Sequence, residues 1–306
     1  MITSPMLILA SAGGDVSLLP ISYSSIGNTG QENGNNSKHN DKIVILTFGN
    51  APKNQYLFAK PILDKYGFKA SFFIVCNWIN KDDGSRMSWQ EIETLRDEGH
   101  DIQAKSMNHK RLTELSAKEL FYEIAEPRNC LSHHGINATI FGTPYGDGNK
   151  NTSVIDSIAK YYDFAITGFS DLMFLHCDGY KNFSSQTDCR TYFDNGTLTS
   201  VNRYSIRESS QDSSNRDYYN DTSRIFEEFV REINSQTVFN KDAITAIPII
   251  AYHDLDNKSS PDSTNVLIFE KEMRYLYDNG FKVITMSDLG YDKEDNFIYI
   301  RESTEE

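Results

Sequence analysis

Residues 43–48 read Ile-Val-Ile-Leu-Thr-Phe, an unbroken run rich in β-branched side chains, and Gly49 and Asn50 follow it directly. A run without polar alternation is typical of a strand that is buried on both faces of a parallel sheet. Such strands are usually joined by helices, and residues 54–66 carry apolar side chains at helical spacing before they stop at Gly67. This stretch therefore predicts a βα unit.

The same alternation continues along the chain. Further strands are expected at residues 70–75, 101–104, 138–141, 164–167, around 202–206, 246–252 and 281–285. Helices are expected at residues 88–97, 116–134, 153–161, 222–233 and 269–277. Repeated βα units over about 250 residues predict an α/β fold, a distorted (β/α) barrel of seven or eight units.

The two ends of the chain differ from this pattern. Residues 1–41 contain a short apolar run that ends in Ala10-Ser11-Ala12, as a signal peptide does, and then a Ser-, Gly- and Asn-rich stretch typical of a flexible linker. We expect one folded domain over residues 42–290 and an acidic tail over residues 291–306. No stretch approaches the roughly 20 apolar residues of a membrane span.

Charge and cysteine content narrow the partners and the compartment. The formal net charge of −13 repels nucleic acid and anionic membrane, so neither is expected as a partner. Seven N-x-S/T triplets favour an exported glycoprotein of the cell surface or exterior. In that setting a disulfide between Cys177 and Cys189 is expected, whereas Cys76 and Cys130 are either a second pair or two buried thiols.

Functional side chains are sought where the strands of a barrel end, because the chemistry of such barrels lies at their carboxyl edge. Four segments follow predicted strands, at residues 49–50, 105–109, 142–146 and 253–254. They supply two imidazoles, a carboxylate, an amide, an ammonium and a phenol, from His109, His253, Asp254, Asn50, Lys105 and Tyr145. Trp78 and Trp89 are read either as sugar-stacking aromatics or as core residues.

Five segments in this order resemble the motifs of the polysaccharide deacetylase (NodB homology) family, carbohydrate esterase family 4. Thr47–Ala51 stands in the place of T-F-D-D-G, Gly99–Ile102 resembles G-H-E-I, and Lys105–His109 stands in the place of H-[ST]-x-x-H. Phe141–Gly146 resembles F-R-x-P-Y-G, and Ile250–Asp254 resembles the final L-x-H-D. The resemblance covers roughly residues 42 to 290 and implies the (β/α) barrel of that family.

The resemblance also implies a chemistry. In that family one Asp and two His hold a divalent metal, commonly zinc, which polarises the acetamide carbonyl and activates a water. A second Asp is the base, a late His protonates the leaving amine, and a backbone N–H of the Pro-Tyr turn stabilises the oxyanion. The implied substrate is an N-acetylated polysaccharide.

Several of these positions are replaced in this chain. The base position is Gly49, the ligand positions are Asn50, Lys105 and His109, and the Arg position of the fourth motif is Gly142. One imidazole, one neutral amide and one ammonium are a poor ligand set for zinc. We therefore expect no tightly bound metal and an impaired deacetylase, with zinc or another divalent metal as the alternative if the chain is active.

The predicted site is made of three groups of residues. His253, Asp254 and Tyr145 are the expected catalytic residues, and His109 is the surviving metal position. Pro144, Tyr145 and Tyr252 are expected to contact substrate. Three functions remain open: an impaired, glycan-binding deacetylase homologue, an active carbohydrate or amide hydrolase with a shifted ligand set, and a structural envelope protein.

Overall fold

A computed structural model describes residues 42–80, 83–148, 151–169, 172–175, 203–212, 222–241, 243–256, 262–292, 294 and 297–302. Within these ranges, parallel strands pair in the order β1, β2, β3, β4, β5, β7, β9, and β9 pairs again with β1, so that the sheet closes into a barrel. Their bounds are Ile43–Gly49, Ser71–Ile74, Asp101–Ala104, Ile140–Gly142, Phe164–Phe169, Ile206–Ser210 and Ile249–Tyr252. The predicted fold class is confirmed.

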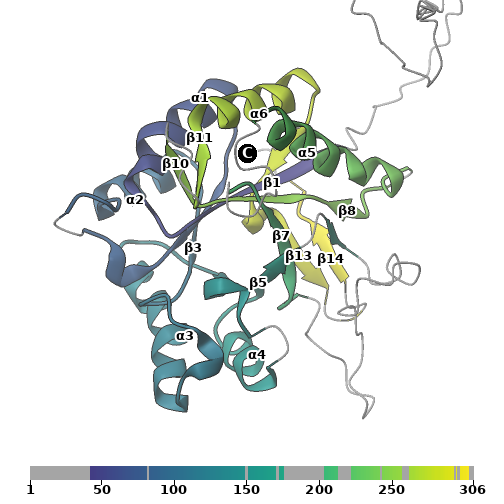
Figure 1. The fold of residues 1–306 in the computed structure, drawn as a ribbon. Coiled ribbons are helices and arrows are strands. Elements are labelled where there is room, and N and C mark those ends of the chain that lie inside the picture. The colour runs from purple at the N-terminus through teal and green to yellow at the C-terminus, as the bar shows by residue number, and fades with distance from the viewer. Residues whose placement is uncertain are drawn as a thin grey trace, which may run out of the picture. The chain divides into compact units, whose positions relative to one another are not determined.

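Helices cover the outside of this barrel (Figure 1). They are α1 (Lys60–Tyr66), α2 (Trp89–Asp97), α3 (Ala117–Ser132), α4 (Thr152–Ala159), α5 (Thr222–Ser235) and α6 (Val266–Asp278). Ser88 and Ser116 are the N-cap residues of α2 and α3, and each forms a capping box. The serine hydroxyl accepts a hydrogen bond from the backbone N–H of the Glu three residues later, and the carboxylate of that Glu accepts one from the serine N–H. None of the helices in the described part is long and apolar enough to cross a membrane.

Shorter strands complete the domain. β12 (Lys282–Ile284) pairs with the first half of β1, and β6 (Met173–Phe174) pairs with β8 (Ala246–Ile247). β10 (Asp254–Asp256) pairs with β11 (Ser263–Asn265) beside the barrel mouth. β13 (Leu289–Asp292) and β14 (Phe297–Ile300) form a hairpin, so part of the segment expected to be a tail is paired and buries Ile298.

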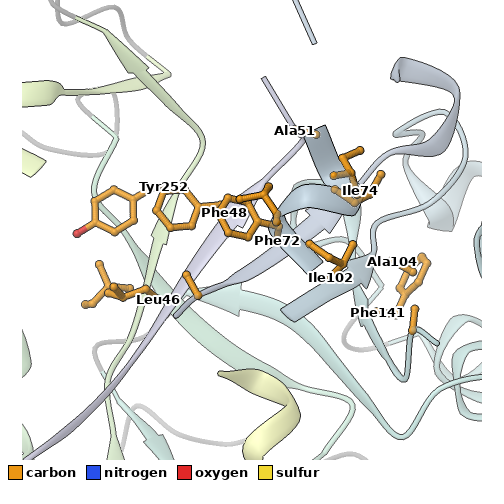
Figure 2. Close-up of a cluster of buried hydrophobic side chains, with 14 of the residues drawn as sticks. Leu46, Phe48, Ala51, Phe72, Ile74, Ile102, Ala104, Phe141 and Tyr252 are labelled. Atoms are coloured by element: carbon orange, nitrogen blue, oxygen red, sulfur yellow. The ribbon is translucent and has the colours of Figure 1, made fainter. Parts of the chain in front are cut away.

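Strand alternation divides the apolar side chains of β1 between two cores. Val44, Leu46 and Phe48 face the helices and pack with the aromatic rings of neighbouring strands (Figure 2). Ile43 and Ile45 face the barrel interior. Because side chains alternate along a strand, Thr47 and Gly49 continue the interior face toward the carboxyl end.

One disulfide lies within the described residues. Cys76, in the turn after β2, is bonded to Cys130 of α3, with a Cα–Cα distance of 6.5 Å. Cys76 and Cys130 therefore form a disulfide and are not two buried thiols. Cys177 and Cys189 lie outside the described residues.

Candidate functional site

A pocket of about 610 Å³ opens at the carboxyl ends of the barrel strands. Six residues selected from the sequence line it together: Asn50, Lys105, His109, Tyr145, His253 and Asp254. They come from the ends of β1, β3, β4 and β9, which are brought together by closure of the barrel. Buried Gln55 links two of these ends, because its side-chain amide donates to the carbonyl oxygens of Gly49 and His253.

His253 forms a pair with a buried carboxylate. Its Nδ1 lies 2.5 Å from Oδ2 of Asp212, its backbone N–H donates to Oδ1 at 3.2 Å, and Ser210 donates to the same carboxylate at 2.8 Å. Burial alone would raise the pKa of Asp212, but these hydrogen bonds and the adjacent imidazole outweigh it and hold the pKa below its usual value. An ionised Asp212 fixes the ring so that Nε2 faces the pocket.

Lys105 is not a surface lysine. It follows β3 on the interior face and is only 7% exposed. Within the described part of the chain its ammonium makes no hydrogen bond or ion pair; Glu208 and Asp212 act on it only through longer-range attraction. Burial lowers the pKa of Lys105, and the two carboxylates offset part of that effect.

Gly49 leaves open the space that the Lys105 amine and the His253 ring approach. A Cβ atom at Gly49 would lie 3.0 Å from Nζ of Lys105, 3.1 Å from Nε2 of His253 and 2.9 Å from Cδ2 of His253. The two nitrogens therefore converge on one point above the end of β1, in space that any larger residue would occupy. Gly142 has an equivalent role, since a Cβ there would lie 2.9 Å from the Phe73 ring.

His109 is enclosed by aromatic rings. Trp78 lies 5.0 Å from it and Tyr145 lies 4.6 Å from it, measured between ring centroids. Neither ring nitrogen of His109 has a hydrogen-bond partner among the residues that the structure describes. Burial, followed by the nearby charge of Lys105, lowers its pKa to about 3, so the imidazole is neutral at physiological pH.

The loops of the site hold strained backbone. Asn50, Ser106, His109 and Tyr145 all have positive φ, between 60° and 72°. Non-glycine residues adopt this conformation at a cost of order 1–3 kcal/mol and cluster at functional sites. The surrounding contacts compensate: for example, Ser106 Oγ accepts from the His109 N–H at 2.9 Å.

The pocket rim carries Arg86 and Asp254. Arg86 donates to the carbonyl oxygen of Asn50 at 3.0 Å and lies over the Trp78 ring, 4.5 Å from its centroid. Burial raises the pKa of Asp254, whose carboxylate accepts from the Leu255 N–H at 2.9 Å. The amide oxygen of Asn50 is buried and has no hydrogen-bond partner within the described ranges.

Two residues expected to contact substrate are not in this pocket. Tyr252 precedes His253 by one position, so strand alternation turns its ring to the opposite face, where it packs against Phe48 (Figure 2). There it also contacts Phe269 and donates to Glu272. Pro144 is buried within the turn that carries Tyr145, whose own side chain is 55% exposed at the pocket edge.

Glu208 and Asp212 were missed by the sequence analysis. The strand expected around residues 202–206 is β7, which runs instead from Ile206 to Ser210. Its apolar part ends at Ile206, but the strand continues through polar residues because its interior face reaches the pocket. Glu208 accepts from the Thr47 hydroxyl at 2.7 Å across that interior. Glu208, two residues after the end of the apolar run at Ile206, was the sequence feature that could have indicated this part of the site.

The described residues do not fit a divalent metal. Among them, no three His, Cys, Asp or Glu side chains gather as a metal site requires. The positions equivalent to the family ligands present one imidazole, one amide oxygen and the ammonium of Lys105, which repels a cation. Of the four acids that line the pocket, Asp212 and Glu208 are already engaged by His253 and Thr47, and Asp254 and Asp262 lie at the rim.

Comparisons with known proteins agree with the motifs. A family model described as polysaccharide deacetylase matches residues 36–164, which confirms the resemblance to that family. A bifunctional xylanase/deacetylase of Pseudobutyrivibrio xylanivorans is 25% identical over 126 residues, 41% of this chain and 20% of that protein. The peptidoglycan-N-acetylmuramic acid deacetylase PdaC of Bacillus subtilis is 31% identical over 117 residues, 36% of this chain and 23% of that protein.

Solved structures match over more of the chain. A family 4 carbohydrate esterase from Streptomyces lividans, in complex with acetate, has a TM-score of 0.51 at 15% identity and covers 85% of this chain and 98% of that one. At this identity the likeness concerns the fold, which is the same closed barrel. The chain spans between 20% and 41% of the length of the curated relatives it matches.

Proposed function

We propose that this chain binds glycan at the mouth of its barrel and that its deacetylase chemistry is impaired. The observation that carries the proposal is the pocket floor, where Gly49 offers no base and the Lys105 ammonium lies beside it. A general base must be within hydrogen-bond reach of the water it activates. The replaced groups would supply that chemistry, whereas the pocket around them has a volume of about 610 Å³ and aromatic walls from Trp78 and Tyr145.

An N-acetylated polysaccharide is the ligand class that we propose. Trp78 and Tyr145 supply aromatic faces of the kind that stack on sugar rings, and Lys105 supplies a donor for an acetamide carbonyl oxygen. The names of the matched relatives support acetylated glycans as the class. The His253–Asp212 pair adds a polar group to the pocket wall.

We propose the cell surface or exterior as the location. The Cys76–Cys130 disulfide supports it, because such bonds persist in oxidising compartments. Asn137, the acceptor position of one N-x-S/T triplet, is exposed and lies in the described part of the chain. Signal cleavage and reducing-gel mobility of the secreted chain test this location.

Calorimetric titration with an N-acetylglucosamine tetramer tests the binding. We expect saturable binding that weakens at least severalfold in Tyr145→Ala, because that ring is the exposed aromatic wall. Tyr277→Ala is the matched control: the ring is 60% exposed on α6 and does not line the pocket. Absence of binding to this tetramer and to a broad glycan array would leave the structural envelope role in its place.

An active hydrolase with a shifted ligand set is the second candidate. It is favoured by one observation: Glu208 and Asp212 bring two carboxylates to the pocket from a strand outside the family motifs already named. Acetate release from the same tetramer is measured with added zinc or cobalt and with chelator. Metal-dependent release that His253→Gln abolishes supports this candidate, and no release under either condition supports impairment.

A further inference from the structure

Lys105 combines burial, access and the absence of a partner. Lys105 is 7% exposed, yet its side chain lines the pocket that opens at the barrel mouth. No described residue accepts a hydrogen bond from its amine or pairs with it as an ion. A buried amine without a partner is costly unless a ligand supplies one or unless it is uncharged. This amine is therefore aimed at something that enters the pocket.

The amine also has a proton carrier beside it. Nζ of Lys105 and Nε2 of His253 lie 3.0 Å and 3.1 Å from the same point above Gly49, and Asp212 holds the far side of the imidazole. We propose that Lys105 is a Schiff-base lysine, which captures the open-chain aldehyde of a reducing sugar. This activity is independent of polysaccharide binding and needs neither a metal nor the missing base.

The step balances without an outside oxidant or reductant. The Nζ lone pair attacks the aldehyde carbon, a C–N bond forms, and the electrons of the carbonyl π bond move to oxygen. His253 Nε2 transfers one proton from nitrogen to that oxygen, which gives a neutral carbinolamine. A second proton, taken by the imidazole from solvent, converts the hydroxyl into leaving water. The product is a protonated imine plus one water.

The surroundings of the amine affect how readily it gives up the proton that must leave before Nζ can attack. Burial lowers the pKa of Lys105, as in lysines that form Schiff bases by desolvation. Glu208 and Asp212 oppose this effect, and Glu208 remains close enough to stabilise the positive imine once it forms. The neighbouring His109 is neutral, since its pKa is lowered to about 3, and so adds no positive charge.

The walls indicate a polyhydroxylated aldehyde. Trp78 and Tyr145 provide apolar faces, while Asp254, Asp262 and Ser263 provide acceptors for hydroxyl groups along the rim. A volume of about 610 Å³ holds a monosaccharide in its open-chain form.

Reductive trapping tests the proposal. The folded full chain is incubated at neutral pH with glycolaldehyde and sodium cyanoborohydride, and the hydroxyethylated lysines are identified by peptide mass spectrometry over time. We expect Lys105 to be modified at least severalfold faster than Lys118, which is exposed on α3 and serves as an internal reference. Addition of glucose should slow labelling of Lys105, whereas its reduced form, glucitol, should not.

Two variants test the role of the Lys105 amine and the role of His253 in proton transfer separately. Lys105→Met should abolish that one adduct and leave the others unchanged. His253→Gln should slow it at least tenfold while thermal unfolding remains cooperative. Labelling of Lys105 no faster than Lys118 in the wild-type chain would overturn the proposal, and this ratio decides even if Lys105→Met fails to fold. An unchanged rate in His253→Gln would overturn the proton-transfer step.

Discussion

Replacing Lys105 by Met should make the protein more stable. The methionine stem fills nearly the same volume, so the change removes the charge and leaves the packing. An ion withdrawn from water costs several kcal/mol in proteins, and Lys105 is 7% exposed with no direct partner in the described part of the chain. Attraction from Glu208 and Asp212 offsets part of this cost. We expect a net gain of about 1–3 kcal/mol at pH 7.

Urea and thermal unfolding at several pH values measure this gain. For a domain of this size about 1 kcal/mol shifts Tm by roughly 2–4 °C. The folded pKa of Lys105 is depressed, so the unfolded chain binds its proton more readily and the wild type is penalised below the unfolded pKa of about 10.4. The advantage of Lys105→Met should therefore shrink as the pH rises toward that value.

The opposite result would refute this reasoning. If Lys105→Met loses more than about 1 kcal/mol with an unchanged denaturant slope, the amine makes a favourable interaction that its burial and missing partner do not indicate. Lys105→Gln is the control variant, because it keeps a polar group without the charge and should gain less than Met. If both variants are more stable than the wild type, the charge of Lys105 is the source of the cost.

Three further outcomes are expected. His100 is buried and its pKa is lowered to about 4, so wild-type stability should fall by about 3 kcal/mol between pH 6.5 and 4, and His100→Asn should flatten that loss in pH-dependent urea melts. Cys130→Ser, which opens a disulfide spanning 54 positions, should cost about 4 kcal/mol in urea unfolding of the oxidised variant against the oxidised wild type. Asp212→Asn should cost about 1–3 kcal/mol at pH 7, a cost that diminishes below pH 4 because the folded pKa of Asp212 is depressed.

The barrel was predictable because its strands alternate between two apolar cores. β1 is buried on both faces, and an unbroken apolar run is what such a strand requires. β7 was displaced by about four residues because the same criterion ends at Ile206, where the interior face becomes polar on approach to the pocket. The boundary error and the omission of Glu208 and Asp212 therefore have one cause.

The sequence predicted which segments meet at the site, but it predicted fewer of the side-chain contacts within it. Motif order placed His109, His253 and Lys105 at one rim, and the structure brings them together. Tyr252 was selected because it adjoins His253, although adjacent strand residues point in opposite directions. The burial of Lys105 depends on empty space above Gly49, which comes from a strand far away in sequence, and no local pattern reports it.

The glycine at position 49 and the lysine at position 105 are sterically coupled. A Cβ atom at Gly49 would lie within about 3 Å of Nζ of Lys105 and of the His253 ring, so a larger residue there requires both groups to shift. An Asp at position 49 alone would place its carboxylate against the Lys105 amine, with which it would form an ion pair. The present floor of the pocket is therefore a self-consistent arrangement, in which glycine gives the amine its place beside the imidazole. A buried amine that has no partner among the described residues, kept at a cost in stability, is the arrangement that the proposed use of that amine requires.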